Sequence, residues 1–221
     1  MNNAIDHRGP DGAGTWKENY IGLGHRRLAI IDTSSSGRQP MITTNKRWVI
    51  TYNGEIYNFK EIRKELEAEG FFFKSQTDSE VVLYSLAHWG KDALLRFNGM
   101  YALALWDRKE KKLLLARDRY GIKPLYYSQQ GSIFSFGSEQ KAILAQNEFQ
   151  RSVNKPALLE YLTFQNILTD QTLMEGINIL KPGHFLEIDF LNSQIDLHQY
   201  WDYSFTNPSN PIDTEEYSKE L

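Results

Sequence analysis

The segment Tyr101-Ala-Leu-Ala-Leu-Trp106 has an apolar residue at every position. Successive side chains of a β-strand point to opposite faces of the sheet, so a strand of this composition is covered on both faces. Three more strand patterns follow it after short polar turns, at residues 112–117, 125–128 and 132–137. Connections this short indicate antiparallel neighbours, because parallel strands need a long crossover. The segment therefore predicts an antiparallel sheet buried between other layers.

Two helices are predicted before this strand. The first covers residues 58–70, where Asn58 can cap the start and Gly70 can end the helix. The second follows Thr77-Asp-Ser-Glu80, which is typical of a capping box, and ends at Gly90. Strands are also predicted at residues 20–24 and 48–52, and a helix at 155–164. Helices beside doubly covered strands favour a layered α+β domain.

Composition excludes several classes of protein. The net charge is −3 and the 25 basic residues are scattered, so no nucleic acid or anionic membrane is expected as a partner. No apolar run approaches the roughly 18 residues of a membrane helix, and the start lacks a signal pattern, so a cytoplasmic location is expected. The absence of cysteine excludes disulfides, cysteine-based zinc sites and thiol catalysis within these 221 residues.

The common short signatures of enzymes are missing. Neither Gly12-Ala-Gly14 nor Gly22-Leu-Gly24 continues into the third glycine of a dinucleotide site. There is no phosphate-binding loop of the GxxxxGK[ST] type, no HExxH and no GxSxG, and the five histidines are too far apart for a local metal cluster.

Specific strings of another kind run through most of the chain. They are His7-Arg-Gly-Pro-Asp-Gly12, Gly24-His-Arg-Arg-Leu-Ala-Ile-Ile-Asp32, Gly37-Arg-Gln-Pro-Met41, Tyr52-Asn-Gly-Glu-Ile-Tyr-Asn58, Thr77-Asp-Ser-Glu80, Phe97-Asn-Gly-Met-Tyr-Ala-Leu-Ala-Leu-Trp-Asp107 and Ala116-Arg-Asp-Arg-Tyr-Gly-Ile-Lys-Pro-Leu-Tyr-Tyr127. In this order they closely resemble the class II glutamine amidotransferase domain of glutamine-hydrolysing asparagine synthetases. The resemblance extends from about His7 to Trp201.

The resemblance implies a fold and a mechanism. The fold would be a four-layer αββα sandwich of the N-terminal-nucleophile hydrolases, with two antiparallel sheets. In that family an N-terminal cysteine attacks the side-chain amide of glutamine, its own amine acts as base, and ammonia passes to an ATP-using domain. Family members carry a strand with this cysteine before the string that starts here at His7. We therefore expect a chain cut at both ends that lacks its first strand and its nucleophile, and that is inactive alone.

Resemblance also assigns roles to residues. Asn53 and Gly54 match the two donors of an oxyanion hole, although Asn-Gly by itself is most typical of a tight turn. Arg27 matches the guanidinium that pairs with the α-carboxylate of glutamine. Asp78, with Glu55 nearby, matches the partner of the α-ammonium, although an acid in the first turn of a helix also has a structural explanation.

Other positions receive smaller roles. Resemblance implies that Ile30 and Ile31 line the same pocket. The Arg117–Pro124 string is interpreted as an ion-paired structural turn, and the His7–Asp11 string as a loop that borders the pocket.

The expected organisation is an amidotransferase domain over residues 1–203, then a linker and the start of a synthetase domain over 204–221. Its partners would be L-glutamine, that C-terminal domain and a second copy of the chain in a homodimer. No cofactor is expected in this chain; ATP and Mg would belong to the absent domain. The alternative is a non-catalytic module that binds glutamine or braces a synthetase partner.

Overall fold

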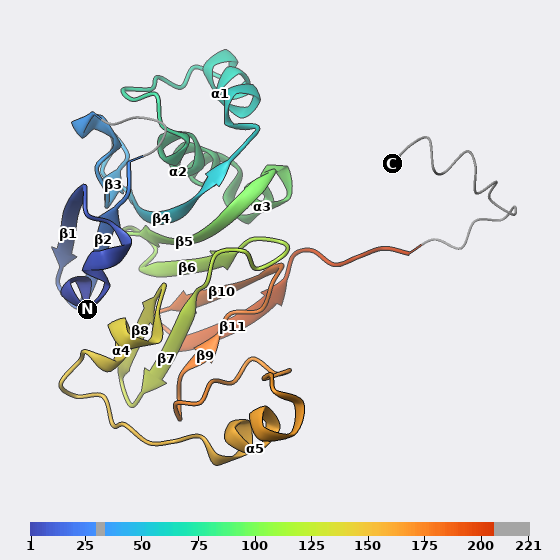
Figure 1. The fold of residues 1–221 in the computed structure, drawn as a ribbon. Coiled ribbons are helices and arrows are strands. Elements are labelled where there is room, and N and C mark those ends of the chain that lie inside the picture. The colour runs from blue at the N-terminus through green and yellow to red at the C-terminus, as the bar shows by residue number, and fades with distance from the viewer. Residues whose placement is uncertain (30–33, 206–221) are drawn as a thin grey trace, which may run out of the picture.

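The computed structural model describes residues 1–29 and 34–205, and its centre is a six-stranded antiparallel sheet (Figure 1). Its strands lie in the order β11-β10-β6-β5-β4-β3. Their bounds are Met41–Ile42 (β3), Trp48–Ile56 (β4), Gly99–Asp107 (β5), Lys112–Arg117 (β6), His184–Asp189 (β10) and Gln194–Gln199 (β11). The apolar segment Tyr101–Trp106 lies inside β5, between β4 and β6, which confirms the predicted antiparallel pairing.

Two smaller antiparallel sheets form a second layer. The strands β1 (Gly12–Glu18) and β2 (Ile21–Arg27) pair with each other, and β7 (Tyr126–Gln130) pairs with β8 (Ile133–Gly137) and β9 (Asn178–Ile179). Side chains from both small sheets pack with Val49, Ala104 and Trp106 of the large sheet in one apolar cluster. The predicted face-to-face sandwich is confirmed.

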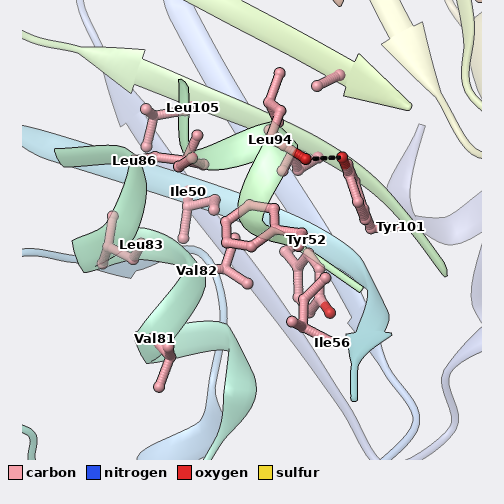
Figure 2. Close-up of a cluster of buried hydrophobic side chains, with 14 of the residues drawn as sticks. Ile50, Tyr52, Ile56, Val81, Val82, Leu83, Leu86, Leu94, Tyr101 and Leu105 are labelled. Atoms are coloured by element: carbon pink, nitrogen blue, oxygen red, sulfur yellow. Dashed lines mark hydrogen bonds between the residues drawn. The ribbon is translucent and has the colours of Figure 1, made fainter. Parts of the chain in front are cut away.

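Helices cover the other face of the large sheet. They are α1 (Phe59–Ala68), α2 (Asp78–Trp89) and the short α3 (Ala93–Arg96), which follows a 3₁₀ turn over Gly90–Asp92. Figure 2 shows Ile50 and Tyr52 of β4 against Val82 and Leu86 of α2. Apolar burial on both faces is therefore the reason that β5 has no polar side chain between Tyr101 and Trp106.

The ends of α1 differ in part from the prediction. Asn58 occupies the cap position, but its side chain makes no capping bond. Its amide instead donates to the carbonyl of Arg96 and accepts from the N–H of Asn98, 3.0 and 2.9 Å away. Gly70 follows the helix with a φ of 91°, a conformation that favours glycine. The residue that was predicted to cap α1 therefore ties the helix to the segment before β5.

The capping box of α2 is half confirmed. Thr77 accepts a hydrogen bond from the N–H of Glu80, as predicted. The carboxylate of Glu80 does not return to Thr77: it accepts from the N–H groups of Lys74 and Ser75. Gly90 ends the helix with a φ of 61°. Glu80 thus orders the loop that leads into α2.

The Arg117–Pro124 turn is structural, as predicted, but backbone groups hold it. Asp118 is fully buried and accepts hydrogen bonds from the N–H groups of Tyr101 and Lys123. Arg117 donates to the carbonyls of Gly121, Lys123 and Leu180. The side chains of Arg117 and Asp118 therefore bond to backbone groups that have no neighbouring strand to pair with. The prediction that ion pairs hold the turn is wrong.

The remaining elements lie around the second layer. They are 3₁₀ helices over Asn2–Arg8 (η1) and Ser35–Gly37 (η2), and helices α4 (Gln140–Leu144) and α5 (Lys155–Phe164). The predicted bounds of α5 match the structure. Of the predicted linker and start of a synthetase domain over 204–221, residues 206–221 lie outside the described residues. Within residues 1–29 and 34–205, no helix has the length and apolar character needed to cross a membrane.

Candidate functional site

A cavity of about 650 Å³ lies where β2, β4 and β8 meet. Arg27, Asn53, Gly54, Glu55 and Asp78 all line it, so the structure brings together these predicted site residues from β2, β4 and the start of α2. Ile30 and Ile31 lie outside the described residues. The volume suits a small polar molecule, since ligand pockets commonly have volumes of several hundred Å³.

Asn53 and Gly54 lie inside β4, where they pair with Ala102 and Tyr101 of β5. The tight-turn interpretation of this dipeptide is therefore wrong. A Cβ atom on Gly54 would collide with the carbonyl oxygen of Met100 and with Tyr101. Only glycine allows β4 and β5 to approach this closely.

The direction of the Gly54 N–H follows from the bonds of its neighbour. Tyr101 donates its N–H to Asp118 Oδ2 at 3.1 Å, and its carbonyl accepts from the N–H of Asp118 at 2.8 Å. Both polar backbone groups of Tyr101 are thus turned away from β4. In an antiparallel ladder, Gly54 and Tyr101 then form a non-hydrogen-bonded pair, so the N–H of Gly54 points away from β5.

Two other residues of β4 whose N–H groups point away from β5 have hydrogen-bond acceptors. The N–H of Tyr52 donates to Gln39 Oε1 at 2.6 Å, and that of Ile56 donates to Asp78 Oδ2 at 3.1 Å. Between them, the N–H of Gly54 has no hydrogen-bond acceptor among residues 1–29 and 34–205. A donor without a partner on the cavity wall is available to a ligand.

The Asn53 amide is a second available donor. Alternation along β4 places the Asn53 side chain on the same face as Thr51, toward the second layer, where both residues line the cavity. None of the residues that the structure describes hydrogen-bonds this amide. Two neighbouring donors that open on one cavity are the arrangement that stabilises an oxyanion.

Arg27 ends β2 and reaches toward the start of α2. Its Nη1 donates to the carbonyl of Ser34 at 2.6 Å. A Cβ atom on Gly37 would collide with the guanidinium of Arg27 and touch the methyl group of Thr77. Gly37 therefore provides the space in which Arg27 lies close to the residue that precedes Asp78.

Asp78 is buried, with 5% of its surface exposed. Its Oδ2 accepts from the hydroxyl of Tyr52 at 2.7 Å and from the N–H of Ile56. No cationic side chain among the described residues forms an ion pair with it. Burial raises the pKa of Asp78, these two hydrogen bonds oppose that rise, and the charge of Glu55 adds to it. A buried carboxylate of this kind favours a cationic ligand.

His25 is a cavity residue that the sequence analysis missed. Its Nδ1 lies 3.3 Å from Thr51 Oγ1, and this hydroxyl donates its one proton to the carbonyl of Gly24. His25 Nδ1 must then carry the proton that it shares with Thr51, which leaves Nε2 as an acceptor. Burial, helped by the charge of Arg27, lowers the pKa of His25 to about 4, so the ring is neutral at pH 7.

The rim of the cavity includes His7 and Arg8, which confirms that the His7–Asp11 string borders the pocket. Glu139 joins this rim to α4 through contacts to His7 Nε2 at 2.9 Å and Lys141 Nζ at 3.0 Å. Among the described residues, no group of three or more His, Asp or Glu side chains is placed to hold a metal ion.

Comparison with solved structures supports the fold. The structure resembles glutamine phosphoribosylpyrophosphate amidotransferase from Bacillus subtilis, with a TM-score of 0.55, 20% identity, and coverage of 81% of this chain and 35% of that chain. A second structure, described as the allosteric regulatory enzyme of purine biosynthesis, has a TM-score of 0.58, 19% identity and the same coverage. Both show the predicted sandwich fold.

Two curated proteins have a higher sequence identity to this chain than these solved structures have. Asparagine synthetase [glutamine-hydrolyzing] 3 of Bacillus subtilis is 38% identical over 96% of this chain and 35% of its own length. Asparagine synthetase [glutamine-hydrolyzing] 1 of the same species is 37% identical over 98% and 33%. The chain thus spans about a third of the length of these relatives.

A family model described as the glutamine amidotransferase domain matches residues 1–201, nearly all of the described part. This match includes the strands and helices that form the cavity. The chain therefore belongs to the class II glutamine amidotransferase domain family.

Proposed function

We propose that the cavity binds L-glutamine and that this domain is the glutaminase part of an asparagine-synthetase-type enzyme. The observation that carries the proposal is that the N–H of Gly54 and the amide of Asn53, on the wall of one cavity, have no hydrogen-bond partner among the residues that the structure describes. Near them lie the guanidinium of Arg27 and the buried carboxylate of Asp78, which forms no ion pair with a cation in the described part of the chain.

Recognition of the amino-acid end would use both charges. Arg27 would pair with the α-carboxylate, a planar contact that guanidinium suits better than an ammonium group. Asp78 would accept from the α-ammonium, with Glu55 adding negative charge. The ligand cation would compensate the burial of Asp78, and Ile30 and Ile31 would complete the apolar lining.

The chemistry would take place at the other end of glutamine. A thiolate attacks the side-chain amide carbon, and the carbonyl oxygen becomes an oxyanion that accepts hydrogen bonds from Asn53 and the N–H of Gly54. The N-terminal amine that took the proton of the thiol would return it to the leaving nitrogen, so that collapse of this intermediate releases ammonia and leaves a thioester, which water hydrolyses to glutamate. The 221 residues contain no cysteine, so we expect this chain to bind glutamine without hydrolysing it.

The ammonia would be used elsewhere. The curated relatives are named as synthetases, and this chain matches about a third of each from Bacillus subtilis. A synthetase domain with ATP and Mg would then accept the ammonia, joined to residues 1–203 through a linker that begins at 204. A cytoplasmic location and a homodimer stay predictions from the sequence.

The test adds a nucleophile to the chain. An N-terminal extension with an apolar strand that begins with cysteine should release glutamate from glutamine, whereas the same extension beginning with alanine should not. Glutamine binding to the unextended chain, measured by calorimetry, should weaken in Arg27→Lys and persist in Arg26→Lys, because Arg26 pairs with Asp6 instead.

Two outcomes would decide against this function. Absence of glutamine binding in the unextended and both extended chains would contradict the assignment of the cavity. Binding without glutamate release by the cysteine-led variant would favour the alternative, a non-catalytic glutamine-binding module.

A further inference from the structure

Helix α5 exposes large apolar side chains to solvent. Leu158 is 37% exposed, Leu159 66% and Leu162 68%, and helical spacing places these three side chains on one face. Ala157 is the one buried residue of α5. Folded monomers rarely leave a contiguous apolar patch of this kind uncovered, and such patches commonly mark interaction sites.

The exposure is not a result of a poorly formed helix. Asn154 caps α5 by accepting from the N–H of Ala157 at 3.1 Å, and Gln165 ends it in a left-handed conformation with a φ of 54°. Glu160 accepts from the N–H of Leu168 at 2.8 Å and holds the following loop. The helix therefore has defined ends and presents its apolar side chains in a fixed arrangement.

The exposed face carries little charge. Lys155 and Glu160 are the charged residues of α5, and Glu160 is used within the chain through Leu168 and Thr169. Lys155 lies one turn before Leu159 at the edge of this face, and the apolar centre of the face resembles the core of a permanent interface more than the surface of a transient one. Burial of a side chain as large as leucine or phenylalanine contributes about 1.5–3 kcal/mol.

We infer that this face of α5, defined by Leu158, Leu159 and Leu162, is the surface on which the ATP-dependent synthetase-type domain packs. The inference rests on the proposed function, because it takes the partner from that assignment. About two thirds of each Bacillus subtilis relative lies outside the match to this chain, which provides an occupant of sufficient size. Figure 1 shows α5 on the side opposite α1 and α2, beyond β7 and β9.

The lack of cysteine allows a direct test. Leu162→Cys places a single thiol on the α5 face, and Phe72→Cys places one at a control position that is 87% exposed near α1. Each variant is prepared as the 221-residue chain and as a chimera in which this chain replaces the matched part of Bacillus subtilis asparagine synthetase 3. Maleimide labelling is followed on the peptide that contains each introduced cysteine.

The chimera should label at least tenfold more slowly at position 162 than the free chain, with equal rates at position 72. Equal rates at position 162 in both would overturn the inference. Asparagine formation from ATP, aspartate and added ammonia verifies the folding of the chimera and needs no glutamine. The labelling result therefore does not depend on glutamine hydrolysis, and a failure of the glutaminase assignment can be distinguished from a failure of this inference.

The free chain provides a second measurement. Leu159→Lys combined with Leu162→Lys should leave the melting temperature within about 2 °C, because exposed side chains contribute little to stability. A large loss of stability would overturn the inference, since it would mean that the chain itself packs on this face. Protection of the Leu162→Cys thiol in a dimer of the free chain would also overturn it, in favour of a second copy as occupant.

Discussion

Helices α2 and α5 have similar local sequences and opposite environments. Each begins with a side-chain cap, from Thr77 in α2 and Asn154 in α5, and each is rich in leucine and other apolar residues. In α2, Val82 and Leu86 have no exposed surface, whereas Leu162 of α5 is mostly exposed. Local sequence thus explains where each helix starts, and the neighbouring layers determine which side chains are covered.

The two helices also differ in what they contribute to the cavity. Asp78 begins α2 on the cavity wall and accepts from Tyr52 and Ile56 of β4. No residue of α5 lines the cavity. The buried helix therefore positions a group of the candidate site, and the exposed helix offers a surface.

The largest contrast is expected from matched truncations in the two helices. Leu86→Ala should lower the free energy of unfolding by about 2–5 kcal/mol, because it leaves a cavity in the core. Leu162→Ala should change it by less than about 0.5 kcal/mol. Urea unfolding measures both, and similar losses in the two variants would contradict the distinction.

Asp78→Asn should weaken glutamine binding about 10- to 100-fold, because it removes a charged hydrogen-bond acceptor worth about 1.5–3 kcal/mol. The same change should stabilise the free chain at pH 7. Burial raises the pKa of Asp78 in the folded state above its ordinary value of 3.8. The contribution of Asp78 to stability is therefore greatest below pH 3.8, where Asp78 is protonated, and is lost as the pH rises through the folded-state pKa and Asp78 ionises.

Melting curves of the parent chain and of Asp78→Asn test whether the charge of Asp78 destabilises the free chain. The variant should melt higher than the parent chain at pH 7, and the difference should disappear below about pH 3.8. Glutamine should raise the melting temperature of the parent chain more than that of Asp78→Asn. A variant that melts lower at pH 7 would show that the Asp78 charge is compensated within the chain.

Smaller effects are expected at the caps. Thr77→Ala and Asn154→Ala each remove a cap worth about 1 kcal/mol. Because α2 is part of the core, Thr77→Ala should lower global stability. Asn154→Ala should instead increase amide exchange within α5 alone, as local opening of an exposed helix does. Global destabilisation by Asn154→Ala beyond that of Thr77→Ala would reverse the comparison.

The predictable parts of the fold have strong local patterns. The apolar run in β5, the strand patterns after it and the bounds of α5 follow from local sequence, and the predicted αββα class agrees with the observed sheet layers. The turn interpretation of Asn53-Gly54 failed because pairing with β5 overrides the local preference of this dipeptide. Close approach to Met100 explains why glycine is present there.

Contacts between distant segments explain the other differences. The side chain of Asn58 bonds to Arg96, the last residue of α3, and to Asn98, and does not cap the start of α1. The carboxylate of Glu80 bonds to Ser75 and does not return to Thr77. His25 had one usable signal. It lies two residues after the buried Leu23 along β2, so its ring is on the same inner face.

The central claim is that Asn53 and Gly54 stabilise an oxyanion while Arg27 binds the substrate. The direct measurement is steady-state kinetics of the cysteine-led variant with Asn53→Ala or Arg27→Ala. Asn53→Ala should lower kcat about a hundredfold or more with little change in KM, and Arg27→Ala should mainly raise KM. A normal kcat in Asn53→Ala, or a normal KM in Arg27→Ala, would contradict the account.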